Sequence, residues 1–219
     1  MPPRTRLLAI FAIMACAALN FAGSGAFADG TTVSPQGMAL AKVLDSSDVE
    51  HLWIAGAHVN WETGVPDGVA EVLPGKHTHC SAFAASVAKR LGVYILRPPE
   101  HRQVLLANAQ NEWLQADEGQ KAGWQPLPGA VEAQAAADAG ELVVASYHNH
   151  HDDKPGHTAI VRPGTKTPTV LASEGPDVIQ AGSTNSRAIS LKGGFAGHPA
   201  AWRDKEVLYF AHPVAWPVN

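Results

Sequence analysis

The spacing of the apolar residues changes near Gly140, and this change limits the folds open to the chain. Before it, apolar residues recur at helical spacing, as in Phe83, Val87 and Leu91. After it come short runs rich in apolar and β-branched residues, such as 142–147, separated by glycine and proline turns. Helices first and strands later indicate an α+β domain, with N-terminal helices packed on a C-terminal antiparallel sheet.

The individual elements follow from the same periodicity. It predicts helices over residues 36–44, 80–91, 101–117 and 131–139. It predicts strands over residues 142–147, 157–162, 169–171, 178–181, 188–191 and 206–210. No linker or repeat divides these elements. We therefore expect one domain over residues 51–219, preceded by a leader and short helix at 29–50.

Residues 1–28 have the pattern of a secretory signal peptide. A basic start precedes the apolar run 7–19, and Ala26-Phe27-Ala28 supplies an A-x-A cleavage site. The run is too short to span a bilayer, so we expect no permanent membrane span. Residues 13–16 resemble a lipoprotein box, and lipidation is the alternative to cleavage after Ala28. We expect an exported protein, either secreted or periplasmic.

Charge argues against one class of partner. The formal net charge is −4, and no lysine- or arginine-rich run is present. Binding to nucleic acid needs a basic surface, so we expect no nucleic-acid partner. We also expect a monomer.

Cys80 is the only cysteine that remains once residues 1–28 are removed. An exported protein seldom keeps one unpaired cysteine, because oxidation and disulfide exchange both threaten it. Cys80 opens a predicted helix, where the N–H groups and the helix dipole lower a thiol pKa and can hold an oxyanion. We therefore predict a nucleophile. A small buried apolar side chain is the alternative.

A thiolate nucleophile needs an imidazole beside it and a group that orients the imidazole. His157 opens an apolar strand after Pro155-Gly156 and is the predicted proton shuttle. Gln180 is polar within an apolar strand, and its amide oxygen is predicted to accept the second ring N–H of His157. An outward-facing strand residue is the alternative for Gln180. Glu174 and Asn185 are the alternative third catalytic residues.

Four short motifs follow one another in a recognisable order. They are Cys80-Ser81 at the start of a helix, Gly140-Glu141-Leu142-Val143-Val144, His157-Thr158-Ala159-Ile160-Val161 and Val178-Ile179-Gln180-Ala181-Gly182. In this order they resemble the D-C-S-G helix and the G-D-L-V-F, H-V-G-I and I-H-A-S strands of the NlpC-type and CHAP-type papain-like cell-wall hydrolases. The resemblance spans roughly residues 60–191.

The chain departs from that family pattern in three places. His79 replaces the acidic residue before the cysteine, and Ala82 replaces the glycine after Cys-Ser. Gln180 stands where the NlpC type usually has histidine. These departures indicate a separate branch and leave the identity of the substrate open.

The resemblance implies a papain-like (NlpC-type) fold and a cysteine peptidase or amidase without a metal or other cofactor. The expected substrate is an amide bond of cell-wall peptide, that is, peptidoglycan. Trp61 lies where NlpC-type proteins carry an aromatic residue lining the cleft. It is expected to contact substrate, together with His79 and Ser81 beside the nucleophile.

Two other functional classes remain open at this point. His148-Asn149-His150-His151-Asp152-Asp153 resembles the H-x-H-x-D-H motif of metallo-β-lactamase-fold hydrolases, with Asp153 in place of the final histidine. A metal-dependent hydrolase is therefore one alternative, and a solvated hairpin loop is the other interpretation of this cluster. His77 and His79 give a weaker metal signal. A non-catalytic cell-wall-binding domain of the same fold is the second alternative.

Overall fold

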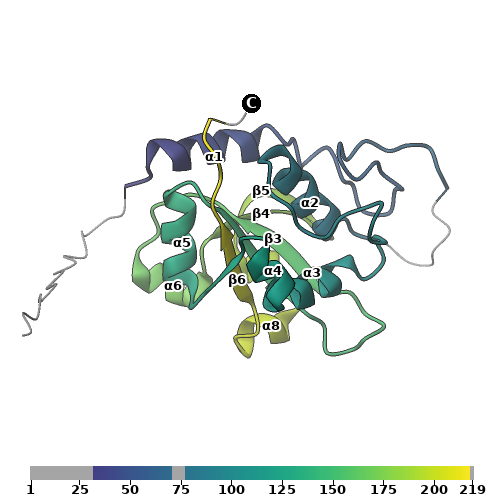
Figure 1. Ribbon diagram of the computed structural model, residues 1–219. Helices are drawn as coiled ribbons and strands as arrows, with labels where there is room; N and C mark the ends of the chain where they lie inside the picture. The colour runs from purple at the N-terminus through teal and green to yellow at the C-terminus, as the bar shows by residue number, and fades with distance from the viewer. Residues whose placement is uncertain (1–31, 71–76, 218–219) are drawn as a thin grey trace, which may run out of the picture.

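A six-stranded antiparallel sheet, with helices on both faces, forms the centre of the molecule (Figure 1). The computed structural model describes residues 32–70 and 77–217. The strand order is β1-β6-β2-β3-β4-β5, and every neighbouring pair is antiparallel. The expected α+β class and antiparallel sheet are confirmed. The signal-like segment 1–28 lies outside the described residues.

The elements alternate along the chain more than the sequence suggested. The helices are α1 (Pro35–Asp45), α2 (Cys80–Arg90), α3 (Leu106–Gln115), α4 (Asp117–Lys121), α5 (Ala130–Asp138), α6 (Pro168–Glu174), α7 (Leu191–Gly194) and α8 (Pro199–Arg203). The strands are β1 (Gln125–Leu127), β2 (Leu142–Tyr147), β3 (His157–Val161), β4 (Asp177–Ala181), β5 (Asn185–Ser190) and β6 (Leu208–His212). Helices thus follow the first strands as well as preceding them.

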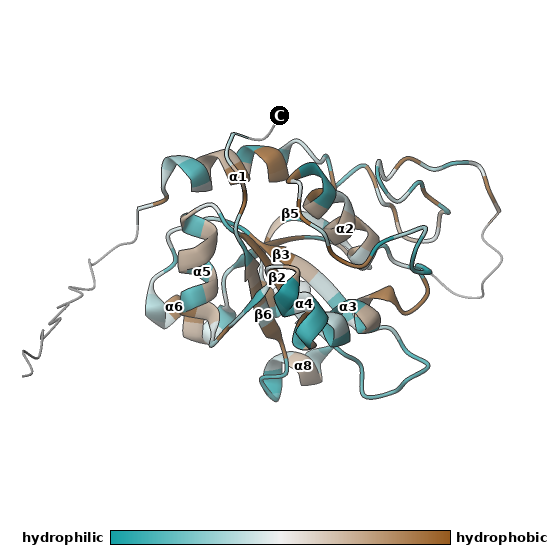
Figure 2. Ribbon diagram, in the orientation of Figure 1, coloured by the Kyte–Doolittle hydropathy of each residue, from teal (hydrophilic) through white to brown (hydrophobic). Residues whose placement is uncertain are grey.

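The sheet has an apolar cluster on each face. In β2, Leu142 and Val144 pack into the cluster that also holds buried residues of α1 and α2. Val143 and Ala145 point the other way, into the cluster with α5. This is the alternation that a strand buried on both faces requires. Figure 2 shows the corresponding hydrophobic colours on the strands between the helices.

Trp53 fixes the segment before α2 against that helix. Its side chain is fully buried, and its ring packs edge-on to Phe83 with centroids 5.1 Å apart. The backbone N–H of Trp53 donates to the Gly64 carbonyl over 2.9 Å. Gly64 has a φ of +71° and lies so close to the indole that a Cβ there would overlap the ring. Trp53 therefore forms part of the core around α2 and holds the 53–64 segment against that helix.

The helix predicted at 101–117 is shorter and broken. Leu105 has left-handed backbone angles, φ +58° and ψ +15°, so α3 begins only at Leu106. Ala116 has an extended ψ of 163°, which separates α3 from α4. Neither break follows from apolar periodicity, because both are set by single backbone conformations.

The strand predicted at 169–171 is wrong, since these residues lie in α6. Thr167 is the N-cap, and its hydroxyl accepts a hydrogen bond from the Val170 N–H over 3.4 Å. Pro168 occupies the first helical turn, where proline is well tolerated. A Thr-Pro start signal was therefore present and was overlooked. Every helix in the described ranges is too short or too polar to cross a lipid bilayer.

Replacing Thr167 with alanine tests this helix start. Loss of the cap should cost about 1 kcal/mol and lower the Tm by roughly 2–4 °C. Thr169→Ala, on an exposed position of the same helix, is the matched control and should change the Tm by less than about 1 °C. Calorimetry of the three proteins measures both shifts. Equal shifts for the two variants would contradict the capping role.

Candidate active site

Cys80 is the first residue of α2 and is 4% exposed. His79 is the N-cap of the helix, and its carbonyl accepts the Phe83 N–H over 2.8 Å. The His79 ring nitrogen Nε2 donates to the Ala57 carbonyl over 2.9 Å. The start of the helix is therefore tied to the preceding loop, which holds the thiol in one place.

His157 begins β3, and its side chain hydrogen-bonds the Cys80 thiol. The β2–β3 pairing sets His157 opposite Tyr147 at the end of the ladder. Gly156 precedes it, and a Cβ at that position would overlap the Tyr147 carbonyl. The close packing of Gly156 against the Tyr147 backbone therefore fixes the position from which the His157 side chain projects.

Gln180 lies beside His157 on β4, the neighbouring strand. The β3–β4 register pairs Ile160 with Ile179, and its continuation sets Gln180 diagonal to His157 on the same face. The distance from Gln180 Oε1 to His157 Nε2 is 2.7 Å. The Gln180 amide nitrogen donates to the Thr184 carbonyl over 3.3 Å. A carbonyl only accepts, so the amide oxygen faces the ring, and Nε2 carries a proton. Nδ1 is then the nitrogen that faces the thiol.

The surroundings favour a charged thiolate–imidazolium pair. Burial alone would raise the pKa of the Cys80 thiol, but the charge and hydrogen bond of His157 outweigh it and lower that pKa. The backbone N–H groups of Thr158 and Ser81 add to the lowering. Burial alone would lower the pKa of His157, but the Cys80 charge and the hydrogen bonds to Cys80 and Gln180 raise it. Each group thus stabilises the ionised form of the other.

Two aromatic rings pack against the His157 imidazole. Phe195 packs edge-on to His157, with centroids 4.8 Å apart. His198 stacks on His157 at 5.9 Å with an interplanar angle of 27°. Burial, and then the charge of His157, lower the pKa of His198. His198 therefore tends to stay neutral beside the imidazolium.

Gln110 connects α2 to β3 from the interior. Its side chain is fully buried, and its amide nitrogen donates to the carbonyls of Ser81 and Leu96 over 3.0 and 2.9 Å. Its amide oxygen accepts the Thr158 hydroxyl over 3.3 Å. Ser81 follows Cys80 and Thr158 follows His157, so Gln110 ties the residues next to both reactive groups together. Sequence analysis missed this residue.

Asn108, two residues earlier on α3, holds the loop between β2 and β3. Its side-chain oxygen accepts the N–H groups of Gly156 and Asn149 over 2.7 and 3.2 Å. Its amide nitrogen donates to the Lys154 carbonyl over 3.0 Å. Ala109 and Trp113, apolar residues of the same helix, are only half-buried. Buried amides, not apolar side chains, thus carry part of the contact between α3 and the sheet.

A cleft of about 490 Å³ opens over Cys80 and His157. Both reactive residues line it, together with His198. Ser81 lines it as well, so one of the three expected substrate contacts lies at the cleft. The volume is in the range typical of ligand sites, about 300–1,000 Å³.

The other two expected substrate contacts lie elsewhere. Trp61 packs against the core, and Lys89 lies over its ring, 5.4 Å from the centroid. Lys89 is nine residues from Cys80 on α2, which is about 14 Å along the helix axis. His79 is buried and bonded to Ala57, as described above. The prediction that Trp61 and His79 contact substrate is therefore not supported by their positions.

The alternative third residues are not at the imidazole. Glu174 ends α6, and its Oε2 lies 3.6 Å from Lys166 Nζ. Asn185 begins β5, where its amide nitrogen donates to the carbonyls of Val49 and Leu52, each over 2.7 Å. Both have structural contacts of their own, which leaves Gln180 at the second ring nitrogen.

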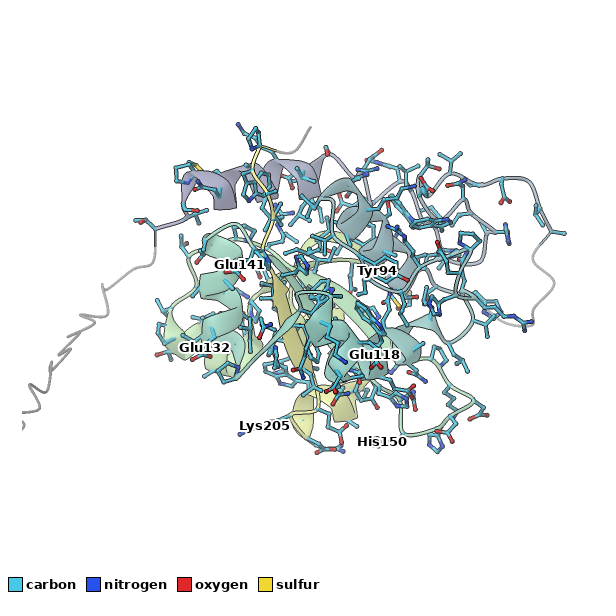
Figure 3. The ribbon with its side chains drawn as sticks, in the orientation of Figure 1. Tyr94, Glu118, Glu132, Glu141, His150 and Lys205 are labelled. Atoms are coloured by element: carbon cyan, nitrogen blue, oxygen red, sulfur yellow. The ribbon has the colours of Figure 1, made fainter. Side chains whose placement is uncertain are left out.

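The histidine side chains of the loop between β2 and β3 bond different partners and do not converge on one point. His148 bonds Glu112 on α3 over 2.8 Å, and His150 bonds Glu206 over 2.8 Å. Figure 3 shows His150 at the outer margin of the molecule. Within 32–70 and 77–217, no three His, Cys, Asp or Glu side chains are grouped so that they could hold a metal ion. The geometry of residues 148–153 is that of a solvated loop.

No family model matches the chain, and no curated protein matches its sequence. A buried thiol at a helix start, an imidazole on a strand and an amide that orients the imidazole are the elements of nucleophilic cysteine chemistry.

The pH dependence of thiol alkylation tests the ion pair. Because His157 lowers the pKa of Cys80, alkylation should reach half its maximal rate below the ordinary thiol pKa of ~8.5. In His157→Ala, burial acts without that partner, so the midpoint should rise above the ordinary value. Iodoacetamide rates between pH 4 and 10 measure both. A native midpoint at or above that of the urea-denatured chain would contradict the pair.

Gln110→Met tests the connection between α2 and β3. It removes two donors and one acceptor from the interior, and should cost about 1–3 kcal/mol. It should also raise the midpoint of Cys80 alkylation, because the Thr158 and Ser81 N–H groups are then less firmly placed. Gln120→Met, on an exposed position of α4, is the control and should change neither quantity. A stability loss with an unchanged midpoint would limit Gln110 to packing.

Proposed function

We propose that this chain is a cysteine hydrolase that cleaves an amide bond. The observation that carries the proposal is the buried Cys80–His157–Gln180 chain of hydrogen bonds at the floor of a cleft. A structural cysteine has no need of a lowered thiol pKa or of an imidazole fixed on its far side. These features together are those of an activated nucleophile.

Each residue has a defined part in the proposed reaction. The Cys80 thiolate attacks the amide carbonyl, and the first-turn N–H groups of α2, which have no carbonyl partner within the helix, hold the oxyanion. His157 gives its proton to the leaving amine, and then takes one from the water that hydrolyses the thioester. Gln180 orients the imidazole throughout, and keeps Nδ1 directed at the thiol.

We further propose that the fold is papain-like and that the substrate is a cell-wall peptide. The support is the order of motifs along the chain: Cys-Ser at a helix start, then a strand, a histidine-initiated strand and a strand bearing the orienting residue. The signal-like segment 1–28 favours export to the compartment in which peptidoglycan lies. Cleavage would occur between two peptide residues or at the amide that joins peptide to sugar.

Removal of the reactive groups tests the hydrolase. Cys80→Ala and His157→Ala should each lower hydrolysis of purified peptidoglycan by about 10³-fold or more, and the double variant should be no worse than either, because they act as one unit. His51→Ala, an exposed histidine bonded only to nearby Asp48, is the matched control and should keep full activity. Mass spectrometry of the released fragments identifies the bond.

Two control treatments separate cysteine from metal chemistry. Alkylation with iodoacetamide should abolish activity, and treatment with a chelator should leave it unchanged. If Cys80→Ala remains active and the chelator inactivates the wild type, the thiol is not the nucleophile. Circular dichroism of each variant shows that the fold is intact.

A further inference from the structure

The cleft is lined by an apolar pair and by several glycines. Val104 and Leu105, in the segment before α3, supply the apolar pair. Gly182, Gly194 and Gly197 also line the cleft and fill none of it with side chains. Such a lining suits a ligand that presents an apolar group to Val104 and Leu105.

Leu105 combines an apolar side chain with a backbone conformation that disfavours it. Its φ of +58° is in the left-handed region, where glycine and asparagine are preferred. Neither apolar cluster of the sheet includes Leu105 or its neighbour Val104. Val104 is 58% exposed, and both residues line the cleft. Backbone strain and apolar exposure at the same place are typical of functional sites.

Gly197 is a glycine that the fold does not require. A Cβ added at this position would meet no atom within 4 Å, and its φ lies outside the left-handed region. Gly194 differs, because a Cβ there would come within 2.9 Å of Gln180 Oε1. The missing side chain at Gly197 therefore widens the cleft without any benefit to packing.

Charge along the cleft argues against an acidic ligand group. Among the described residues, those that line the cleft include Asp153 but no lysine or arginine. The His157 imidazolium at this surface is already paired with the Cys80 thiolate, so it is a poor partner for an acidic substrate side chain. An apolar side chain would instead remove Val104 and Leu105 from water.

We propose that Val104 and Leu105 form a subsite for the apolar side chain of a peptide residue next to the scissile amide, and that Gly197 leaves the space for it. The inference rests on the proposed cysteine hydrolase and names its substrate class. The preferred substrate carries an apolar residue, alanine or larger, at this position.

Alkylation of Cys80 by two probes measures the subsite without any need for turnover. The ratio of rates for N-isobutyl iodoacetamide and for iodoacetamide should be about 10 in the wild type, as expected for burial of a few carbon atoms. Leu105→Asn tolerates the left-handed backbone, so it should lower this ratio towards 1 while the Tm stays unchanged or rises by about 2–4 °C. Gly197→Val should lower the ratio as well, because its side chain would occupy the widened space.

Val131→Ser, an exposed valine on α5 that does not line the cleft, is the matched control for Val104→Ser. The control should keep the wild-type ratio of alkylation rates, and in Val104→Ser this ratio should fall towards 1. Peptides with leucine or glutamate at the flanking position should then differ in kcat/KM in the same sense. A wild-type ratio near 1 with normal hydrolysis would overturn the subsite alone. A Cys80 that reacts no faster than a free thiol, with no hydrolysis, would overturn the hydrolase itself.

Discussion

The hydrogen bond between Cys80 and His157 joins a helix and a strand that pack against each other. Cys80 begins a helix that covers one face of the sheet, and His157 begins a strand within the sheet. Two charged groups at such a junction are costly to bury unless they lie close together and are hydrogen-bonded. The start of α2, the start of β3 and the β4 amide must therefore be placed together, and much of the surrounding structure serves that placement.

Amide side chains do most of this placement. Gln180 orients the imidazole, Gln110 ties the residues that follow Cys80 and His157, and Asn108 holds the loop before β3. An amide can donate and accept at once without a charge of its own. It therefore fixes the geometry of an ion pair while adding no third charge that would compete with it.

Local sequence patterns predicted the roles of Cys80, His157 and Gln180, because each residue has a recognisable signal in its own segment. Cys80 is a lone cysteine at a helix start, His157 follows a Pro-Gly turn, and Gln180 is a polar residue in an apolar strand. Gln110 and His198 had no such sign, since their importance comes from contacts with residues distant in the chain. The failed prediction of a strand at 169–171 had a different cause, because β-branched residues there outweighed a proline-containing helix start.

The attachment of the β2–β3 loop by Asn108 has an evolutionary consequence. Asn108 Oδ1 accepts hydrogen bonds from the loop near both of its ends, at Asn149 and at Gly156. Residues 150–153 lie between these two attachment points. The length and composition of that part are thereby uncoupled from the position of His157. Insertions, deletions or a new binding function can arise at residues 150–153 while the imidazole stays in register. The loop is thus a place where related chains can diverge in specificity without rebuilding the centre.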